Sequence, residues 1–132
     1  MGSLENGDAH QQSAGTVLLV DDDPRFRAIL QAFLELNGCT VVTAGAGDDA
    51  LERIALDAPN VVLLDMRMPG MDGILTLKHL RMAHPHLPVI CVTQDGEDGT
   101  REEALTLGAN DYLLKPLNFE QLRAILFLKI FA

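Results

Sequence analysis

Side chains capable of chemistry follow four short apolar runs of this sequence, at the point where each run ends. They are Asp21 and Asp22 after 17–20, Asp65 after 61–64, Thr93 after 88–92, and Lys115 after 112–114. A buried parallel strand has no structural need of a terminal carboxylate, whereas the ligands of open α/β sheets bind at the carboxyl ends of the strands. The spacing therefore predicts one site that combines carboxylates, a hydroxyl and an amine.

Three carboxylates in one crevice require either protons or a cation. At about 4–6 Å each pair repels by about 1 kcal/mol in water, and by more at a lower dielectric. Oxygen ligands without a neighbouring His or Cys favour a hard ion, and Mg²⁺ binds carboxylates, water and phosphate oxygens. Lys115 would pair with Asp65 in the empty site and with an anion in the filled one. This chemistry suits phosphoryl transfer onto a carboxylate, with Asp65 as the expected acceptor.

Alternating strand and helix patterns would position these side chains. Strands are predicted at Thr16–Val20, Cys39–Ala44, Asn60–Leu64, Leu87–Val92 and Asp111–Leu114. Helices are predicted over about 26–34 with Asn37-Gly38 as the cap, over Asp48–Leu56, Gly73–Met82 and Thr100–Leu107, and from Asn118 to the end. Strict alternation predicts an α/β fold, a doubly wound, flavodoxin-like (βα)5 three-layer sandwich with parallel strand order 2-1-3-4-5. In that order the first and third strands are neighbours, which brings the three acids together.

Length and composition limit the other possibilities. The chain has 132 residues, is 48% hydrophobic and carries a net charge of −9, which fits a globular domain. The negative charge argues against nucleic acid or an anionic membrane surface as a direct partner. The sequence shows no signal peptide and no apolar run long enough to cross a bilayer, so a cytoplasmic location is expected. In that compartment Cys39 and Cys91 are expected to be buried, reduced thiols. Residues 1–14 are predicted to be a disordered tail, partly a cloning remnant, and 15–132 the domain.

Taken together, these positions resemble the receiver domain of two-component response regulators, in the CheY-like superfamily. The resemblance covers about residues 16–129. It rests on four motifs in order: Asp21-Asp22, Asp65 with Met68-Pro69-Gly70-Met71-Asp72-Gly73, Thr93, and Lys115-Pro116. Each motif alone is weak, but all four at these spacings are highly specific. The resemblance implies a phosphorelay signalling domain rather than an enzyme that turns over an external substrate.

The resemblance also implies a role for each acid. Asp65 would accept a phosphoryl group from a phosphohistidine of a sensor histidine kinase or a histidine phosphotransfer protein. Mg²⁺ would be bound directly by Asp22 and Asp65, largely through water by Asp21, and by the main-chain carbonyl of Arg67. These assignments describe the metal half of the expected site.

The remaining motif residues would bind and sense the phosphoryl group. Lys115 and Thr93 would hold its oxygens, and the Lys115–Pro116 peptide bond would be cis. Tyr112 matches the family's aromatic residue that changes rotamer when Thr93 is drawn toward the phosphate. The expected consequence is a local switch that alters the face formed by the fourth and fifth units.

Three positions depart from the commonest family pattern. Gln94 stands where a small residue is usual and could narrow access to Asp65. Arg67 and Asp95 occupy positions that, in the family that the chain resembles, tune how fast water removes the phosphoryl group. Because they carry opposite charges, we hypothesise that they pair across the site mouth and lengthen the phosphorylated lifetime. Asp23, by contrast, is most simply the N-cap of a helix that starts at Pro24.

Other functions remain as alternatives. A non-phosphorylated receiver-like interaction module would be favoured mainly by Gln94. An aspartyl phosphatase would need an acid two residues after the nucleophile, where this chain has Arg67. Flavin binding would need a phosphate-cradling loop after the first strand, where the chain has acids.

The end of the chain carries an unusual number of apolar residues. Phe127, Leu128, Ile130 and Phe131 make the last helix apolar nearly all round. A surface helix normally keeps a polar face. These residues are therefore predicted to contact a second subunit, or a further output domain, with the second reading preferred.

Overall fold

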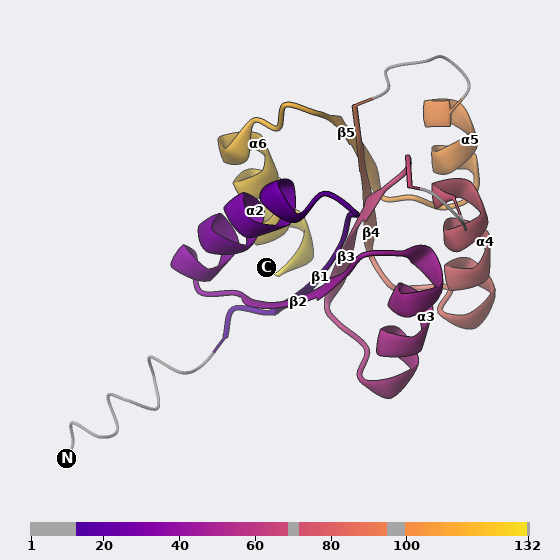
Figure 1. Cartoon of the computed structure of the whole chain (residues 1–132), viewed down its shortest axis with the longest axis horizontal. Helices are drawn as coiled ribbons and strands as arrows, with labels where there is room; N and C mark the ends of the chain where they lie inside the picture. The colour runs from indigo at the N-terminus through magenta and orange to yellow at the C-terminus, as the bar shows by residue number, and fades with distance from the viewer. Residues whose placement is uncertain (1–12, 69–71, 95–99, 132) are drawn as a thin grey trace.

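Five parallel strands form the centre of the molecule (Figure 1). The computed structural model describes residues 13–68, 72–94 and 100–131. The strands are β1 (Thr16–Val20), β2 (Thr40–Ala44), β3 (Val61–Asp65), β4 (Val89–Thr93) and β5 (Asp111–Leu114). Their order in the sheet is β2-β1-β3-β4-β5, which confirms the predicted doubly wound topology. Every residue of β3 and β4 is buried, as expected of continuous apolar runs in the middle of a parallel sheet.

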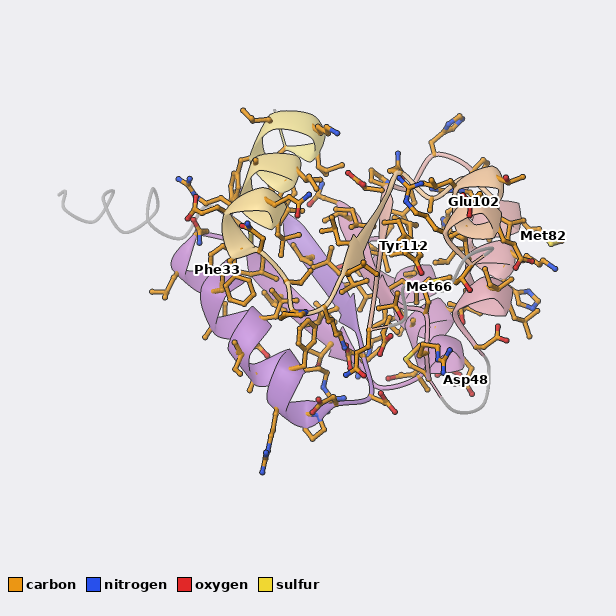
Figure 2. All side chains as sticks on the ribbon, turned by 90° about the horizontal axis from the view of Figure 1, so that it is seen from above. Phe33, Asp48, Met66, Met82, Glu102 and Tyr112 are labelled. Atoms are coloured by element: carbon orange, nitrogen blue, oxygen red, sulfur yellow. The ribbon has the colours of Figure 1, made fainter. Side chains whose placement is uncertain are left out.

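Helices cover both faces of this sheet. They are α2 (Pro24–Leu36), α3 (Gly47–Leu56), α4 (Gly73–Ala83), α5 (Thr100–Thr106), α6 (Phe119–Ala124) and the π-helical turn η1 (Ile125–Ile130). Figure 1 shows α2 and α6 on one face and α3, α4 and α5 on the other. The apolar core is divided accordingly into two clusters, one on each side of the sheet. Phe33 of α2 lies beside α6, whereas Tyr112 lies toward the α4–α5 side (Figure 2).

Two predicted strand ends move by one residue in a way that concerns the site. Asp65 and Thr93 are the last residues of β3 and β4, not the first residues after them. The ladder continues to Asp65 because it pairs in register with Val92, and the N–H of Met66 still donates to the Val92 carbonyl at 3.2 Å. Both polar side chains are therefore held by sheet hydrogen bonds rather than by a loop.

The first helix begins as the sequence predicts. The Asp23 carboxylate accepts hydrogen bonds from the backbone N–H groups of Arg25 at 2.9 Å and Phe26 at 3.4 Å, and Pro24 is the first helical residue. After the cap at Asn37, Gly38 adopts a φ of +89°, a conformation that favours glycine. The structural reading of Asp23 as an N-cap is confirmed.

Most of the apolar side chains at the end of the chain pack within the domain itself, and their predicted contact with a second subunit or an output domain stays a prediction. Phe127, Ile130 and Phe131 are half-buried against the α2–α6 side of the core, and the Phe131 ring lies where a Cβ atom on Gly15 would be. Leu128 is 74% exposed. The π-helical turn, in which the N–H of Phe131 donates to the Leu126 carbonyl at 2.8 Å, carries these rings onto the sheet. Three of the four apolar side chains thus complete the domain's own core.

Other expectations have simpler outcomes. Cys39 and Cys91 are buried free thiols, and burial raises the pKa of Cys91 to about 12. Within the described residues, no helix combines the length and apolar character needed to cross a membrane. Of the predicted tail at 1–14, residues 1–12 lie outside the described residues, as do Pro69, Gly70, Met71 and Asp95. Ser13 and Ala14 are described and join the domain, because the N–H of Ala14 donates to the Gly38 carbonyl at 2.9 Å and the N–H of Thr40 to the Ser13 hydroxyl at 3.1 Å.

Candidate functional site

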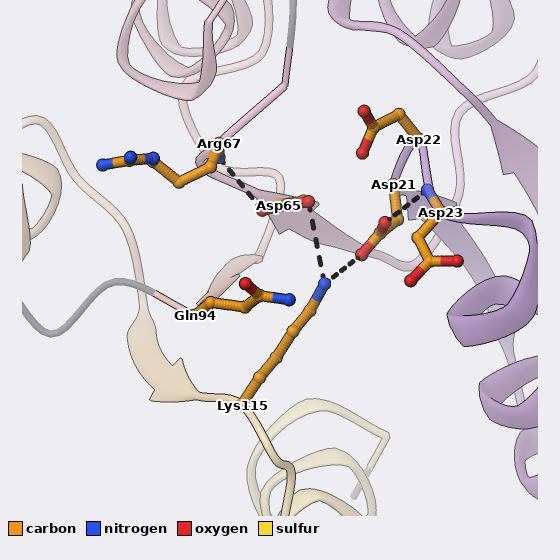
Figure 3. A pocket seen from close by; sticks show the side chains of 7 residues that line it. All are labelled: Asp21, Asp22, Asp23, Asp65, Arg67, Gln94 and Lys115. Carbon is orange, nitrogen blue, oxygen red and sulfur yellow. Dashed lines mark hydrogen bonds and ion pairs between the residues drawn. The ribbon is translucent and has the colours of Figure 1, made fainter.

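A polar cavity of about 460 Å³ opens at the carboxyl edge of the sheet (Figure 3). It is lined by Asp21, Asp22, Asp23, Asp65, Arg67, Gln94 and Lys115. Parallel register explains the convergence, because Val20 pairs with Leu64 and Leu64 with Cys91, so the three strands end at the same level. The crossovers of a doubly wound sheet therefore bring β1, β3 and β5 side chains into one cavity.

Three carboxylates meet at the centre of this cavity. Asp21, Asp22 and Asp65 each offer one oxygen atom, and these atoms all lie within 4.8 Å of one another. Asp21 is 1% exposed and Asp65 is 5% exposed, whereas Asp22 is open to solvent. Asp21 Oδ1 accepts a hydrogen bond from the N–H of Asp23 at 2.9 Å, and Asp65 Oδ1 accepts one from the N–H of Arg67 at 3.0 Å. The two buried acids are thus oriented by the turns that follow their strands.

The Lys115 ammonium group forms ion pairs with two of these carboxylates. Its Nζ lies 2.7 Å from Asp21 Oδ2 and 3.7 Å from Asp65 Oδ2. The lysine was expected to pair with Asp65, and it does contact that carboxylate, but its shorter bond is to Asp21. One ammonium group facing three carboxylates leaves a net negative charge in the cavity.

The pKa of Asp65 reflects this environment. Burial raises the pKa of Asp65 from the ordinary value of 3.8 to about 6, and the negative charges of Asp21 and Asp22 also raise this pKa. The N–H of Arg67 and the charge of Lys115 oppose this rise without cancelling it. The acceptor candidate is therefore a carboxylate whose charge is poorly compensated by the protein itself.

A hard divalent cation fits the donor set. Three carboxylates with only one neighbouring ammonium group provide oxygen ligands and excess negative charge, which are the requirements of Mg²⁺. No cysteine or histidine lines the described part of the cavity, which disfavours softer metals. The three carboxylates could therefore hold a metal ion, and a hard divalent cation suits them best.

Thr93 and Tyr112 are not among the residues that line the cavity. Thr93 is completely buried and Tyr112 is 8% exposed. The N–H of Lys115 donates to the Thr93 carbonyl at 2.8 Å, so the backbone links the two residues expected to bind the phosphoryl group. The Lys115–Pro116 peptide bond is cis, as expected.

Comparison with known proteins decides the family. The model of the response regulator receiver domain matches residues 17–127. The chain belongs to this family. Among curated relatives of this receiver domain is the transcriptional regulatory protein ZraR of Escherichia coli K12, 44% identical over 110 residues, covering 83% of this chain and 25% of that protein. The DNA-binding transcriptional regulator NtrC of the same strain is 40% identical over 111 residues, covering 84% and 24%. The receiver domain thus spans about a quarter of the length of these relatives.

Solved structures agree with this assignment. The BeF3-activated N-terminal receiver domain of Klebsiella pneumoniae RstA has a TM-score of 0.82 and 34% identity, covering 87% of this chain and 97% of that one. The receiver domain of the Francisella response regulator 1452 has a TM-score of 0.80 and 32% identity, covering 86% and 94%.

Two residues of α2 reach the site of this receiver domain in ways that the sequence did not reveal. Arg27 Nη1 donates to the Asp21 carbonyl at 2.6 Å, and the Phe26 ring lies beneath Lys115 with its centroid 4.0 Å from Nζ. Phe26 is the first apolar residue of the helix predicted over about 26–34, a spacing that indicates only a core position, and Arg27 belongs to no motif. Their contacts depend on how α2 crosses the strand ends, which local sequence patterns do not specify.

The predicted tuning pair is only partly described. Arg67 is exposed at the cavity edge, and Gln94 lies beside Lys115 (Figure 3). Asp95 lies outside the described residues, so its pairing with Arg67 stays a prediction. Met66 and Met68 are buried, as expected of packing residues beside the site.

Proposed function

We propose that Asp65 is the phosphoacceptor of this receiver domain, and that the donor is a phosphohistidine on a sensor histidine kinase or a histidine phosphotransfer protein. A carboxylate oxygen of Asp65 would attack phosphorus, the P–N bond would break, and the imidazole would leave with a proton. The observation that carries the proposal is a buried, undercompensated carboxylate within 3.7 Å of Lys115 Nζ and beside two further acids. Family membership supports the same role.

The acids would hold Mg²⁺, which supplies charge neutralisation for the incoming phosphoryl oxygens. Asp22 and Asp65 are proposed as direct ligands, together with the main-chain carbonyl of Arg67. Asp21 is proposed to act through water, because its carboxylate already accepts hydrogen bonds from Lys115 and from the N–H of Asp23. Asp21 is also buried, so we propose that it orients the other groups of the site and does not make the first contact with an incoming ion.

Lys115 and Thr93 are proposed to bind the phosphoryl oxygens, and Tyr112 to report that binding. In the β4–β5 register Cys91 pairs with Tyr112 and Thr93 with Leu114. Cys91 and Thr93 are two residues apart on β4, so their side chains point to the same face of the sheet. Tyr112 is the partner of Cys91 on β5 and points to that face too, so the Thr93 and Tyr112 side chains share the α4–α5 side of the sheet. A movement of the Thr93 hydroxyl toward the phosphate would change the packing that surrounds Tyr112.

This activity would serve a regulator larger than the receiver domain. The named relatives are transcriptional regulators in which the matched segment is a quarter of the protein. We propose that this receiver acts in the cytoplasm on an output domain, or on a second copy, through its α5–β5–α6 face. The net charge of −9 disfavours direct contact of the receiver itself with nucleic acid.

Intact-mass measurement after incubation with acetyl phosphate and Mg²⁺ tests the acceptor. The wild-type chain should gain one phosphoryl group, and neither Asp65→Ala nor wild type in EDTA should do so. Gln94 lines the cavity and is proposed to narrow access to Asp65, so a failure with acetyl phosphate is followed by beryllofluoride, the ligand type of the activated RstA structure. Failure of both would favour the alternative, a receiver-like module that interacts without phosphorylation.

A further inference from the structure

We propose that Phe26 is a positioning residue for Lys115, and that its aromatic face holds the ammonium group beside the acceptor carboxylate. The inference rests on the proposed function, because it concerns the lysine that would bind the phosphoryl group. Phe26 belongs to α2 and is not among the residues that line the polar cavity. Its ring contacts Lys115, and its N–H donates to the Asp23 carboxylate. It is therefore a supporting residue and not a catalytic one.

The geometry is that of a cation–π interaction in a sheltered place. Lys115 Nζ lies 4.0 Å from the centroid of the Phe26 ring, and the lysine side chain is only 10% exposed. A cation within about 6 Å of a ring centroid is attracted by the ring quadrupole, more strongly when water is excluded. The ring thus joins Asp21 and Asp65 as the third contact of the ammonium group.

The ring differs from the two acids in one respect that matters for the reaction. A cation bound among Asp21, Asp22 and Asp65 would compete with Lys115 for the acids and weaken those ion pairs. The attraction between the ammonium group and an uncharged ring does not depend on the acids' charge. Phe26 would therefore keep Lys115 in place under the conditions in which phosphoryl transfer occurs.

The position of the ring is itself well determined. Phe26 lies in the first turn of α2, where its N–H is capped by the Asp23 carboxylate. The next residue, Arg27, binds the Asp21 carbonyl at 2.6 Å and so fixes the same turn to the end of β1. The ring also borders a groove that is lined by Ile29, Gln94, Lys115, Pro116, Leu117 and Phe119. A leucine at position 26 would fill much of this space but would lack the aromatic face.

The first experiment compares Phe26→Leu, Phe26→Tyr and the matched control Phe33→Leu. Phe33 lies two turns further along α2 and packs on the Phe119 ring at 4.6 Å, away from the cavity. The probes are beryllofluoride affinity in Mg²⁺ and the initial rate of phosphorylation by acetyl phosphate. Loss of the aromatic face should reduce both about three- to tenfold. Phe26→Tyr should stay within about twofold of wild type, and Phe33→Leu should do so while losing comparable folding stability.

A second measurement observes the contact directly. In the wild-type NMR spectrum the ε-protons of Lys115 should be shifted upfield by the ring current of Phe26, relative to Lys78 and Lys129, the other lysines of the chain. The shift should persist in Phe26→Tyr and disappear in Phe26→Leu. If Phe26→Leu does not fold, Phe26→Met replaces it as a flexible side chain without an aromatic face.

The outcomes separate this inference from the proposed function. Unchanged beryllofluoride affinity and rate in Phe26→Leu, despite a lost ring-current shift, would overturn the positioning role. Absence of the shift in the wild type would overturn the geometry itself. A wild-type chain that neither takes up the phosphoryl group nor binds beryllofluoride would overturn the proposed function, while the ring-current measurement would still decide the Phe26–Lys115 contact.

Discussion

Asp65 combines two properties that oppose each other, burial and negative charge. Its carboxylate is 5% exposed, and burial raises its pKa to about 6, so ionisation at neutral pH costs folding stability. If Asp65 had only a structural role, an amide or an apolar side chain could replace it without loss of folding stability. Its presence at the end of a fully buried strand is consistent with the proposed acceptor role.

Asp65→Asn should therefore stabilise the metal-free protein at neutral pH. With the pKa raised from 3.8 to about 6, the native state binds more protons than the unfolded state between these values, so stability falls as the pH rises through that window. In EDTA at pH 7.5 the variant should gain about 2–3 kcal/mol in unfolding free energy. Urea denaturation followed by circular dichroism measures this gain.

The gain should shrink as the pH falls from 6 to 4, because wild-type Asp65 becomes neutral. Glu52→Gln, at an exposed position of α3, provides a control for the loss of one negative charge. An equal gain in that control, or a gain for Asp65→Asn that is the same at pH 4 and pH 7.5, would contradict the assignment to Asp65 burial.

Removal of Lys115 should separate metal binding from phosphoryl transfer. The Lys115 ammonium lies 2.7 Å from Asp21 and competes with any cation for the acids. Lys115→Ala should therefore bind Mg²⁺ about three- to tenfold more tightly at low ionic strength, yet accept the phosphoryl group more slowly. Titration calorimetry and intact mass measure the two effects. The control is Lys129→Ala, which removes an exposed ion pair with Asp111 and should change neither the Mg²⁺ affinity nor the rate of phosphorylation. Weaker Mg²⁺ binding by Lys115→Ala would show that Lys115 does not compete with the metal for the acids.

At the scale of elements, the turn after β3 depends on a close approach between two backbones. Gly73, the first residue of α4, lies so near Met66 that an added Cβ would overlap the Met66 Cα and sulfur. Gly73→Ala should displace the turn that follows Asp65, lower the unfolding free energy by about 1–3 kcal/mol and weaken Mg²⁺ binding. Denaturation and calorimetry test the two losses.

Gly38→Ala is the matched control for this substitution. Gly38 has a positive φ, but a Cβ there meets nothing within 4 Å, and the residue lies at the opposite end of α2 from the site. It should lose about 1–2 kcal/mol through backbone strain with no change in Mg²⁺ affinity. Normal Mg²⁺ affinity in Gly73→Ala would show that the turn adjusts without moving the acids.

Much of this architecture could be predicted from residue patterns because the elements are locally encoded. Apolar runs define β1 and β5 to the residue, and the Asp23-Pro24 pair marks the start of α2. The convergence of the acids follows from strand order alone. The Phe26–Lys115 contact was not predictable, because it joins residues 89 positions apart (115 minus 26) through the crossing of α2 over the strand ends. The η1 turn was missed because an all-apolar helix face does not reveal which surface covers it.

At the scale of the whole molecule, the last residues of the described chain help to cover the α2–α6 face of the sheet. Phe127, Ile130 and Phe131 belong to the α2–α6 side of the core, and the Phe131 ring lies across Gly15 just before β1. This packing binds the last turn to the first strand, on the face of the sheet opposite α3, α4 and α5. The described end of the chain is therefore part of the fold and not an extension beyond it.

Phe131→Ala should consequently destabilise the domain, whereas Leu128→Ser should not. Loss of a half-buried aromatic ring should lower the unfolding free energy by about 1–3 kcal/mol, and replacement of a leucine that is 74% exposed should change it by less than about 0.5 kcal/mol. Urea denaturation measures both, and sedimentation velocity shows whether either variant changes association. If these apolar residues instead joined two subunits, Leu128→Ser would shift the sedimentation profile and Phe131→Ala would leave the isolated domain's stability intact. The direction of these two results therefore distinguishes an intramolecular core from a subunit interface.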